Sequence, residues 1–297
     1  MNPVSTLKTF EDIDCEFPKS LQSALELMAD EKTRGQPLAG GTDLMVQWES
    51  GVIPIPDRAI SVKNIPELRE IRENGSNVII GGSVTHMELR QSPIVRRWLP
   101  SLAEAAATIG GFQIQIMGTI AGNVANASPA ADLAPSLLIT DGTVLLASVE
   151  GEREVKLTEL WTGYRKIDRR PEELIVSFNL PKLLDDYFES WRKLGPRKAQ
   201  AISKVMGSSR GRISNGVVES FKVALGSVAP TAIRFFELEQ WITGKPYSKE
   251  TLQEAEQRSA ALINPISDIR STAEYRKWVS GKLVRCFLEN LAGRSNK

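Results

Sequence analysis

Residues 113–135 read QIQIMGTIAGNVANASPAADLAP, and this stretch is the most informative in the chain. Gly118 and Gly122 have no side chain to obstruct a ligand, so their backbone N–H groups can come close to a bound oxyanion. Thr119 and Asn123 add a hydroxyl and an amide beside them. A short glycine-rich loop by itself is more often only a turn, so a functional interpretation needs support from elsewhere in the sequence.

That support comes from residues 38–44, which read LAGGTDL. The paired glycines Gly40 and Gly41 follow a short apolar run, and Thr42 adds a second hydroxyl donor. Together the two loops could hold a pyrophosphate from both sides. Neither loop matches the glycine fingerprint of a Rossmann fold or of a P-loop. The residues alone therefore predict an anion site made of two loops, with a nucleotide as one candidate ligand.

The composition of the 297-residue chain is that of an ordinary globular protein, with 41% hydrophobic and 25% charged residues. Lys and Arg number 37 against 36 Asp and Glu, so the chain has no excess of positive charge with which to bind a nucleic acid. No stretch approaches the roughly 18 apolar residues of a membrane span, and residues 1–9 do not resemble a signal peptide. We therefore expect a cytoplasmic protein with no nucleic-acid or membrane partner.

Thiol and imidazole groups are scarce in this chain. Cys15 and Cys286 are its only cysteines, whereas an iron–sulfur cluster needs about four thiolates. His86 is its only histidine, and no G-x-S-x-G motif accompanies it, which disfavours both a zinc site and a hydrolytic triad. In its Thr-rich surroundings we expect His86 to be an ordinary polar loop residue. We predict no metal ligand and no catalytic side chain.

Apolar periodicity predicts a chain that mixes helices and strands. Ser20 is a candidate N-cap for a helix over residues 20–32. Further strands are predicted over 58–62, 77–82, 143–149, 155–157, 174–180, 189–205 and 217–228, and further helices over 99–109, 250–262 and 273–291. This alternation favours an α+β or α/β architecture over an all-β one.

The two loops, together with segments spread along the chain, resemble the FAD-binding medium subunit of the xanthine dehydrogenase and carbon monoxide dehydrogenase family, the molybdenum hydroxylases. The additional segments are Gly163-Tyr164-Arg165-Lys166, Glu172-Glu173-Leu174-Ile175, Lys193 with Arg197-Lys198 and Ile202, residues 226–234 (GSVAPTAIR), Asn264-Pro265 and Glu274-Tyr275-Arg276. They occur in the order expected for that family and cover nearly the whole chain.

The resemblance implies an α+β protein with an FAD-binding fold of the vanillyl-alcohol-oxidase (PCMH) type. Residues 1–183 would form the FAD-binding domain, with subdomains of about 1–62 and 63–183. Residues 184–297 would form a C-terminal α/β flavoprotein domain that covers the flavin.

The resemblance also implies which residues bind FAD: Leu38, Ala39, Gly40, Gly41, Thr42, Asp43, Leu44, Ile109, Ile114, Gly118, Thr119, Gly122, Asn123, Ala125, Asn126, Asp132, Ile175 and Lys193. Both loops would hold the pyrophosphate. Asp132 would contact the ribose or adenine end, although it could instead be the N-cap of a helix that begins at Leu133. Ile175 would pack near the isoalloxazine ring. Lys193 would lie by the N1–C2=O edge of that ring, unless it is only a solvated surface lysine.

Three segments depart from the family pattern. Ala121 replaces the first of two glycines in the second loop, which is tolerable if the backbone φ is negative there. Gln115-Ile116 stand where the family often has Arg-Asn, so a polar contact could be missing. Residues 199–201 are Ala-Gln-Ala where acidic residues are common in the family.

The function implied by the resemblance is that of an electron-transfer subunit. Its FAD would take electrons from [2Fe–2S] clusters in a small partner subunit and pass them to NAD or another acceptor. A large partner subunit would carry the molybdenum cofactor and act on a substrate that this sequence does not reveal. Two alternatives remain open at this point: a stand-alone FAD-dependent oxidoreductase with His86 as its acid–base group, and a non-catalytic scaffold subunit that has lost FAD.

Overall fold

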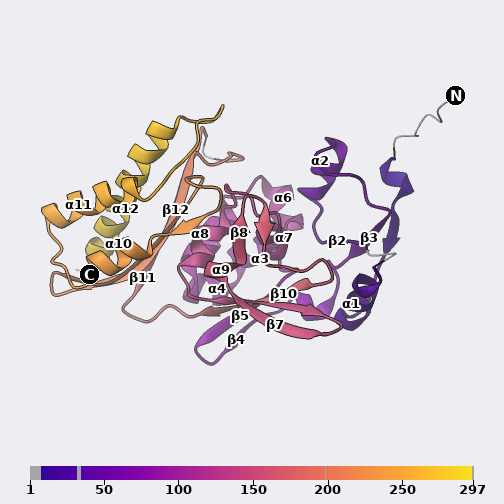
Figure 1. Cartoon of the computed structure of the whole chain (residues 1–297). Coiled ribbons are helices and arrows are strands. Elements are labelled where there is room, and N and C mark those ends of the chain that lie inside the picture. Colours follow the sequence, from indigo (N-terminus) through magenta and orange to yellow (C-terminus); the bar gives the residue numbers. More distant parts are fainter. Residues whose placement is uncertain (1–7, 32–34, 198, 296–297) are drawn as a thin grey trace.

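The computed structural model describes residues 8–31, 35–197 and 199–295. Three consecutive parts of the chain each build a sheet, and the parts follow one another across the molecule (Figure 1). Among the described residues no helix has both the length and the apolar character needed to cross a membrane.

The N-terminal part is a small parallel sheet of strand order β1-β3-β2. Its elements are η1 (Phe10–Asp12), β1 (Asp14–Glu16), α1 (Leu21–Ala29), β2 (Gln36–Leu38), α2 (Leu44–Glu49) and β3 (Arg58–Ser61). The hydroxyl of Ser20 accepts a hydrogen bond from Ser23 N and so caps α1, as predicted. Lys32, the predicted end of this helix, lies outside the described residues. The loop 38–44 leaves the carboxyl end of β2 and leads directly into α2.

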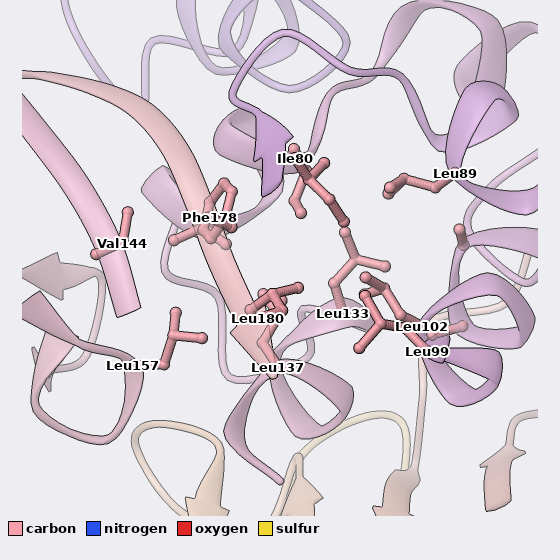
Figure 2. Packing of buried hydrophobic residues seen from close by; sticks show 14 of the residues in the cluster. Ile80, Leu89, Leu99, Leu102, Leu133, Leu137, Val144, Leu157, Phe178 and Leu180 are labelled. Atoms are coloured by element: carbon pink, nitrogen blue, oxygen red, sulfur yellow. The ribbon is translucent and has the colours of Figure 1, made fainter. Parts of the chain in front are cut away.

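The central part surrounds an antiparallel sheet of strand order β4-β5-β10-β6-β7. Its elements are η2 (Pro66–Leu68), β4 (Ile71–Asn74), β5 (Asn77–Gly81), α3 (His86–Gln91), α4 (Pro93–Trp98), α5 (Pro100–Ala107), α6 (Phe112–Met117), α7 (Ile120–Ala125), α8 (Leu133–Leu138), β6 (Thr143–Ser148), β7 (Gly151–Lys156), α9 (Leu157–Leu160), β8 (Trp161–Gly163), β9 (Lys166–Ile167) and β10 (Leu174–Pro181). Figure 2 shows the main core, in which Ile80 and Phe178 of the sheet and Leu102 and Leu137 of the helices gather around one apolar interior. The strands predicted over 77–82, 143–149 and 174–180 are confirmed.

The C-terminal part is an antiparallel sheet of order β11-β12-β13-β14 with helices packed on it (Figure 1). Its elements are β11 (Phe188–Leu194), β12 (Val205–Ser214), β13 (Val217–Gly226), β14 (Ile233–Arg234), α10 (Phe236–Ile242), α11 (Lys249–Ala261) and α12 (Ala273–Ser295). Side chains of β13 alternate between its two faces. Val223 and Leu225 join the core under α12, whereas Ala224 packs with Ala134 of α8. The sheet is therefore covered on both faces, and on one face the covering helix, α8, comes from the central part of the chain.

The predicted strand 189–205 is wrong in extent. β11 ends at Leu194, residues 195–197 and 199–204 belong to no helix or strand, and a separate strand, β12, follows. The sequence of β12, VMGSSRGRIS, has few apolar side chains, so periodicity does not reveal it. Gly207 explains this composition, because a Cβ there would lie 2.2 Å from Leu225 Cδ2 and 3.2 Å from Phe287 Cε2. The strand is buried by close packing of its backbone, not by large side chains.

Candidate functional site

The two glycine loops touch each other, although 77 residues separate Gly41 from Gly118. A Cβ placed on Gly40 would lie 1.9 Å from the carbonyl oxygen of Met117 and 3.0 Å from Gly118 Cα. No other residue type fits at position 40 unless the loops move apart. The backbone of one loop therefore packs directly on the backbone of the other.

The first loop presents unused hydrogen-bond donors. Gly41 adopts φ +69°, a left-handed conformation that favours glycine, and this turns the chain into α2. Within the described part of the chain, the backbone N–H groups of residues 40–43 donate no hydrogen bond. Consecutive free N–H groups in a turn form a concavity suited to an anion.

The second loop is organised differently from the prediction, because most of it is helical. Thr119 caps α7, and its Oγ1 accepts a hydrogen bond from Gly122 N at 3.1 Å. The N–H groups of Ile120 and Ala121 are also engaged, with Val84 O at 2.9 Å and Gly82 O at 3.0 Å. The unpaired polar group of this loop is on a side chain: the buried amide oxygen of Asn123 has no hydrogen-bond partner among the described residues. An orphaned buried oxygen is a sign of a group that a ligand completes.

A polar bridge joins the ends of the two loops. Gln47, in the first turns of α2, donates its amide hydrogens to Asp43 Oδ2 and, at 3.2 Å, to Asn126 Oδ1. Its amide oxygen accepts from Arg165 Nη1 at 3.1 Å. Gln47 was not among the predicted site residues, although its position four residues after Asp43 in a helix indicates that the two side chains can meet.

Asp132 and Lys193 form one buried ion pair. Lys193 Nζ lies 2.5 Å from Asp132 Oδ2 and donates to Thr108 O at 3.1 Å, and Ser203 Oγ donates to Asp132 Oδ1 at 2.9 Å. The Lys193 and Asp132 side chains are only 10% and 9% exposed. Burial raises the pKa of the Asp132 carboxyl, although Lys193 and Ser203 oppose that shift.

This pairing excludes the two structural alternatives raised for these residues. Asp132 stands at the N-cap position of α8 but makes no side-chain capping bond there, and Lys193 is not a solvated surface residue.

The remaining predicted contact residues surround these features. Leu38 ends β2, Ala39 packs on the N-terminal core, Leu44 begins α2, and Ala125 ends α7. The three isoleucines differ in exposure: Ile175 of β10 is buried, Ile109 is half-buried, and Ile114 of α6 is 37% exposed. The carbonyl of Ile175 lies so close to Gly82 that a Cβ on Gly82 would be 2.4 Å from it. Strand β10 thus lies against the segment that supports the second loop.

Two of the departures from the family pattern have local explanations. Ala121 lies inside α7 with an ordinary negative φ, and its methyl group packs toward the main core. Gln115 is buried, donates to Ala107 O and Ile109 O, and accepts from Arg90 Nη1 at 2.6 Å. The polar contact expected to be absent is thus replaced by one that ties α6 to α5. Lys198 lies outside the described residues.

His86 was predicted to be a polar loop residue, and that prediction is wrong. It is the first residue of α3 and is only 3% exposed. A Cβ on Gly118 would lie 3.0 Å from its Nε2, so the imidazole supports the second loop from behind. Burial lowers the pKa of His86 to about 4, which keeps it neutral near pH 7. Its Nδ1 has no hydrogen-bond partner among the described residues.

Comparison with known proteins agrees with this geometry. Residues 9–183 match the family model of the FAD binding domain in molybdopterin dehydrogenase, and residues 190–291 match that of the CO dehydrogenase flavoprotein C-terminal domain. The chain belongs to this family of molybdopterin dehydrogenase FAD-binding subunits. The resemblance seen in the sequence is confirmed, and so are the α+β FAD-binding fold, the FAD cofactor and the assignment to an oxidoreductase.

The relatives of this FAD-binding subunit align over most of their length. The carbon monoxide dehydrogenase medium chain of Hydrogenophaga pseudoflava is 31% identical over 272 residues, which covers 90% of this chain and 93% of the relative. A putative xanthine dehydrogenase FAD-binding subunit of Escherichia coli is 32% identical over 263 residues, 86% of this chain and 88% of the relative. A solved carbon monoxide dehydrogenase from Hydrogenophaga pseudoflava superposes with a TM-score of 0.91 at 30% identity, covering 95% of this chain and 98% of that one.

Proposed function

We propose that this subunit transfers electrons within a molybdenum-containing dehydrogenase and that its FAD lies between residues 38–44 and 118–126. The observation that carries this proposal is the contact of Gly40 with the Met117–Gly118 backbone, which brings both loops within reach of one diphosphate. One further observation supports it. The N–H groups of residues 40–43 are free and can donate to phosphate oxygens.

In this proposal the loop residues act through small polar groups. The backbone of residues 38–44 donates to the diphosphate, and the hydroxyls of Thr42 and Thr119 add donors. Gly122 keeps the approach open because it is exposed and carries no side chain. Asn123 would donate from its amide NH2 group to the diphosphate. Ala125 and Asn126 would contact the cofactor on the side of the site that faces α2.

We place the Asp132–Lys193 pair at the flavin end of FAD. Lys193 would face the N1–C2=O edge of the ring, where a cation stabilises negative charge on the reduced flavin. Asp132 and Thr108 would hold that ammonium in place, and Ile109, Ile114 and Ile175 would pack against the ring. FAD supplies the capacity to accept and release electrons. The chain supplies position and electrostatic environment.

The proposal includes the division of the chain into domains. Residues 1–183 would form the FAD-binding domain, with subdomains of about 1–62 and 63–183, and residues 184–297 the C-terminal domain. The proposed junction falls between β10 and β11, and Lys193 reaches from the second domain to Asp132 of the first.

The partners proposed are a large subunit with the molybdenum cofactor and a small subunit with [2Fe–2S] clusters. Relatives that carry the names medium chain and FAD-binding subunit support this, since such names denote one member of an assembly. Electrons would arrive from the small subunit and leave to NAD or another acceptor.

The cofactor site is tested by the visible absorption spectrum of the purified full chain, followed by heat release of any bound flavin. We expect flavin bands and release of FAD at about one per chain. A colourless chain that also takes up no added FAD would contradict the proposal and favour the scaffold alternative.

The acceptor is tested by mixing the FAD-loaded chain with NADH in the absence of oxygen. Bleaching of the flavin bands is expected if NAD is the physiological acceptor, because hydride transfer then runs in reverse. Bleaching by dithionite but not by NADH would point to a different acceptor.

The stand-alone oxidoreductase is the weaker candidate. It requires a titratable group near the flavin, and His86 was the residue considered for that role. In the structure His86 is buried behind Gly118 with a pKa of about 4, so it supports the loop and is poorly placed to exchange protons with a substrate near pH 7.

A further inference from the structure

The proposed diphosphate site has a charge deficit. Each phosphate of FAD carries a negative charge, yet the segments 38–44 and 118–132 contain Asp43 and Asp132 and no Lys or Arg. Backbone N–H groups and hydroxyls provide only partial charges, whereas phosphates in proteins are commonly paired with a guanidinium or ammonium group. A cation from another part of the chain would therefore strengthen this site considerably.

Arg165 is placed to supply that cation. It occupies the turn between β8 and β9 and adopts φ +54°, a left-handed conformation that is uncommon for arginine. Its Nη1 donates to Gln47 Oε1 at 3.1 Å, and Gln47 in turn binds both Asp43 and Asn126. One glutamine side chain therefore separates the guanidinium from the ends of both loops.

The guanidinium also has unused capacity. It carries five N–H donors, of which the Gln47 contact uses one. No carboxylate lies within ion-pair distance of Arg165 in the described part of the chain, and the side chain is exposed. The ring centroid of Tyr164 lies 6.0 Å from the guanidinium carbon.

A second cation near the loops is Lys63, which follows β3. Its Nζ lies 3.3 Å from the sulfur of Met117, a weak acceptor. Lys63 makes no contact with Asp43, Gln47 or Asn126 among the described residues, so it is not joined to the polar bridge between the loops.

We propose that Arg165 binds the diphosphate of FAD and that Gln47 positions its guanidinium. The planar group can meet two phosphate oxygens at once, which an amide or hydroxyl cannot do. This inference rests on the proposed FAD site between the two loops. It adds a binding residue from a hairpin that is distant from both loops in sequence.

The test is the dissociation constant of FAD from the apo form of the full chain, followed by quenching of flavin fluorescence. Four variants are compared with the parent: Arg165→Gln, Arg165→Lys, Lys166→Gln and Lys63→Gln. We expect R165Q to weaken FAD binding by at least about tenfold, since a charge-assisted hydrogen bond contributes that much. R165K is expected to recover part of the loss. K166Q removes a neighbouring exposed charge from the same hairpin and is expected to leave the affinity unchanged, as is K63Q.

Riboflavin, which lacks phosphate, separates a diphosphate contact from a general effect on the site. R165Q is expected to leave riboflavin binding unchanged and to reduce the salt dependence of FAD binding. The inference is overturned if R165Q binds FAD as tightly as the parent, if it weakens riboflavin equally, or if K63Q shows the larger loss. A parent chain that binds no FAD would instead refute the proposed function itself.

Discussion

Single atoms decide the contact between the loops, as position 40 shows. The hydrogen of Gly40 faces the carbonyl of Met117 at a distance that leaves no room for a methyl group. This constraint is invisible in the motif itself, where Gly40 and Gly41 look equivalent. Gly41 is required for its left-handed backbone, whereas Gly40 is required for the space it leaves.

Gly40→Ala should therefore separate the two loops. We expect a loss of about 1–3 kcal/mol in the free energy of unfolding, typical of overpacking, together with weaker FAD binding. Urea denaturation and FAD titration measure the two effects. Gly293→Ala is the matched control, because a Cβ there meets no atom within 4 Å. Equal FAD affinity in G40A and the parent would show that the loops need not touch.

His86 gives the chain a specific pH dependence. Its pKa is about 4 in the folded state and about 6.5 in the unfolded state, so the unfolded chain binds more protons between these values. The free energy of unfolding should accordingly fall by about 3 kcal/mol as the pH drops from 6.5 to 4. The pKa of Asp132 is raised by burial, so this carboxyl changes the free energy of unfolding in the opposite direction as the pH falls. It is present in the parent and in any His86 variant, so its effect cancels when the two are compared.

Urea denaturation of the parent and of His86→Gln at pH 7 and pH 5 measures this effect. Each protein then has a change in the free energy of unfolding between pH 7 and pH 5. Because His86 is the only histidine, the difference between these two changes is due to its imidazole. We expect the parent to lose more stability than the variant between the two pH values. Identical changes would contradict the burial of a neutral imidazole.

At the scale of elements, the helix α7 occupies most of the segment that the sequence predicted to be an anion-binding loop. Its N-terminal cap, Thr119, and its exposed glycine, Gly122, come from the motif that resembles an anion-binding turn. The backbone donors of this motif mostly stabilise the helix and its contact with residues 82–84. The free donors belong to the first loop, so the two loops have unequal roles.

Thr119→Val tests both functions of the cap residue. Removal of the hydroxyl should cost about 1 kcal/mol of stability, the usual value for a lost N-cap, and should weaken FAD binding as well. Thr119→Ser keeps the hydroxyl and serves as the control. Urea denaturation and FAD titration distinguish the outcomes. If T119V loses stability but binds FAD normally, the hydroxyl caps α7 and is not a ligand donor.

At the scale of the whole molecule, a buried ion pair holds the two domains together. Glu189 of β11 accepts from Ser101 N at 2.9 Å and from Arg210 Nε at 2.7 Å, and Arg210 also donates to Pro181 O. The Glu189 and Arg210 side chains are 0% and 6% exposed. This network joins α5 and the end of β10 to the C-terminal sheet, on the same side of that sheet as the Asp132–Lys193 pair.

Glu189→Ala should destabilise the fold strongly, because it leaves the Arg210 charge buried without a partner. We expect a loss of about 3–5 kcal/mol, measured by urea denaturation. Glu159→Ala is the control: its pair with Lys156 is 64–70% exposed, and such pairs contribute about 0–1 kcal/mol. Similar losses in both variants would refute the role of Glu189 between the domains.

Much about this protein is determined by local sequence. Periodicity locates the helices α1, α5, α11 and α12 and the strands β3, β5, β6 and β10, because each has an apolar face that its own residues specify. The two glycine motifs predict an anion site, since their residue types allow the backbone to approach an anion. The family and its cofactor follow from the resemblance of these motifs, together with other segments of the chain, to a known family. These features depend on neighbours within a few positions.

Tertiary structure alone decides the rest. The strand β12 is buried because β11 and β13 pair with it on either side and α12 packs on it. The residue pattern within β12, with its glycines and serines, does not predict this burial. Asp132 meets Lys193, and Gln47 meets Arg165, across separations of 61 and 118 residues. Such contacts depend on how the sheets and helices pack against one another. The sequence predicts most residues of the candidate site, and the tertiary packing determines which of them form ion pairs and hydrogen bonds with one another.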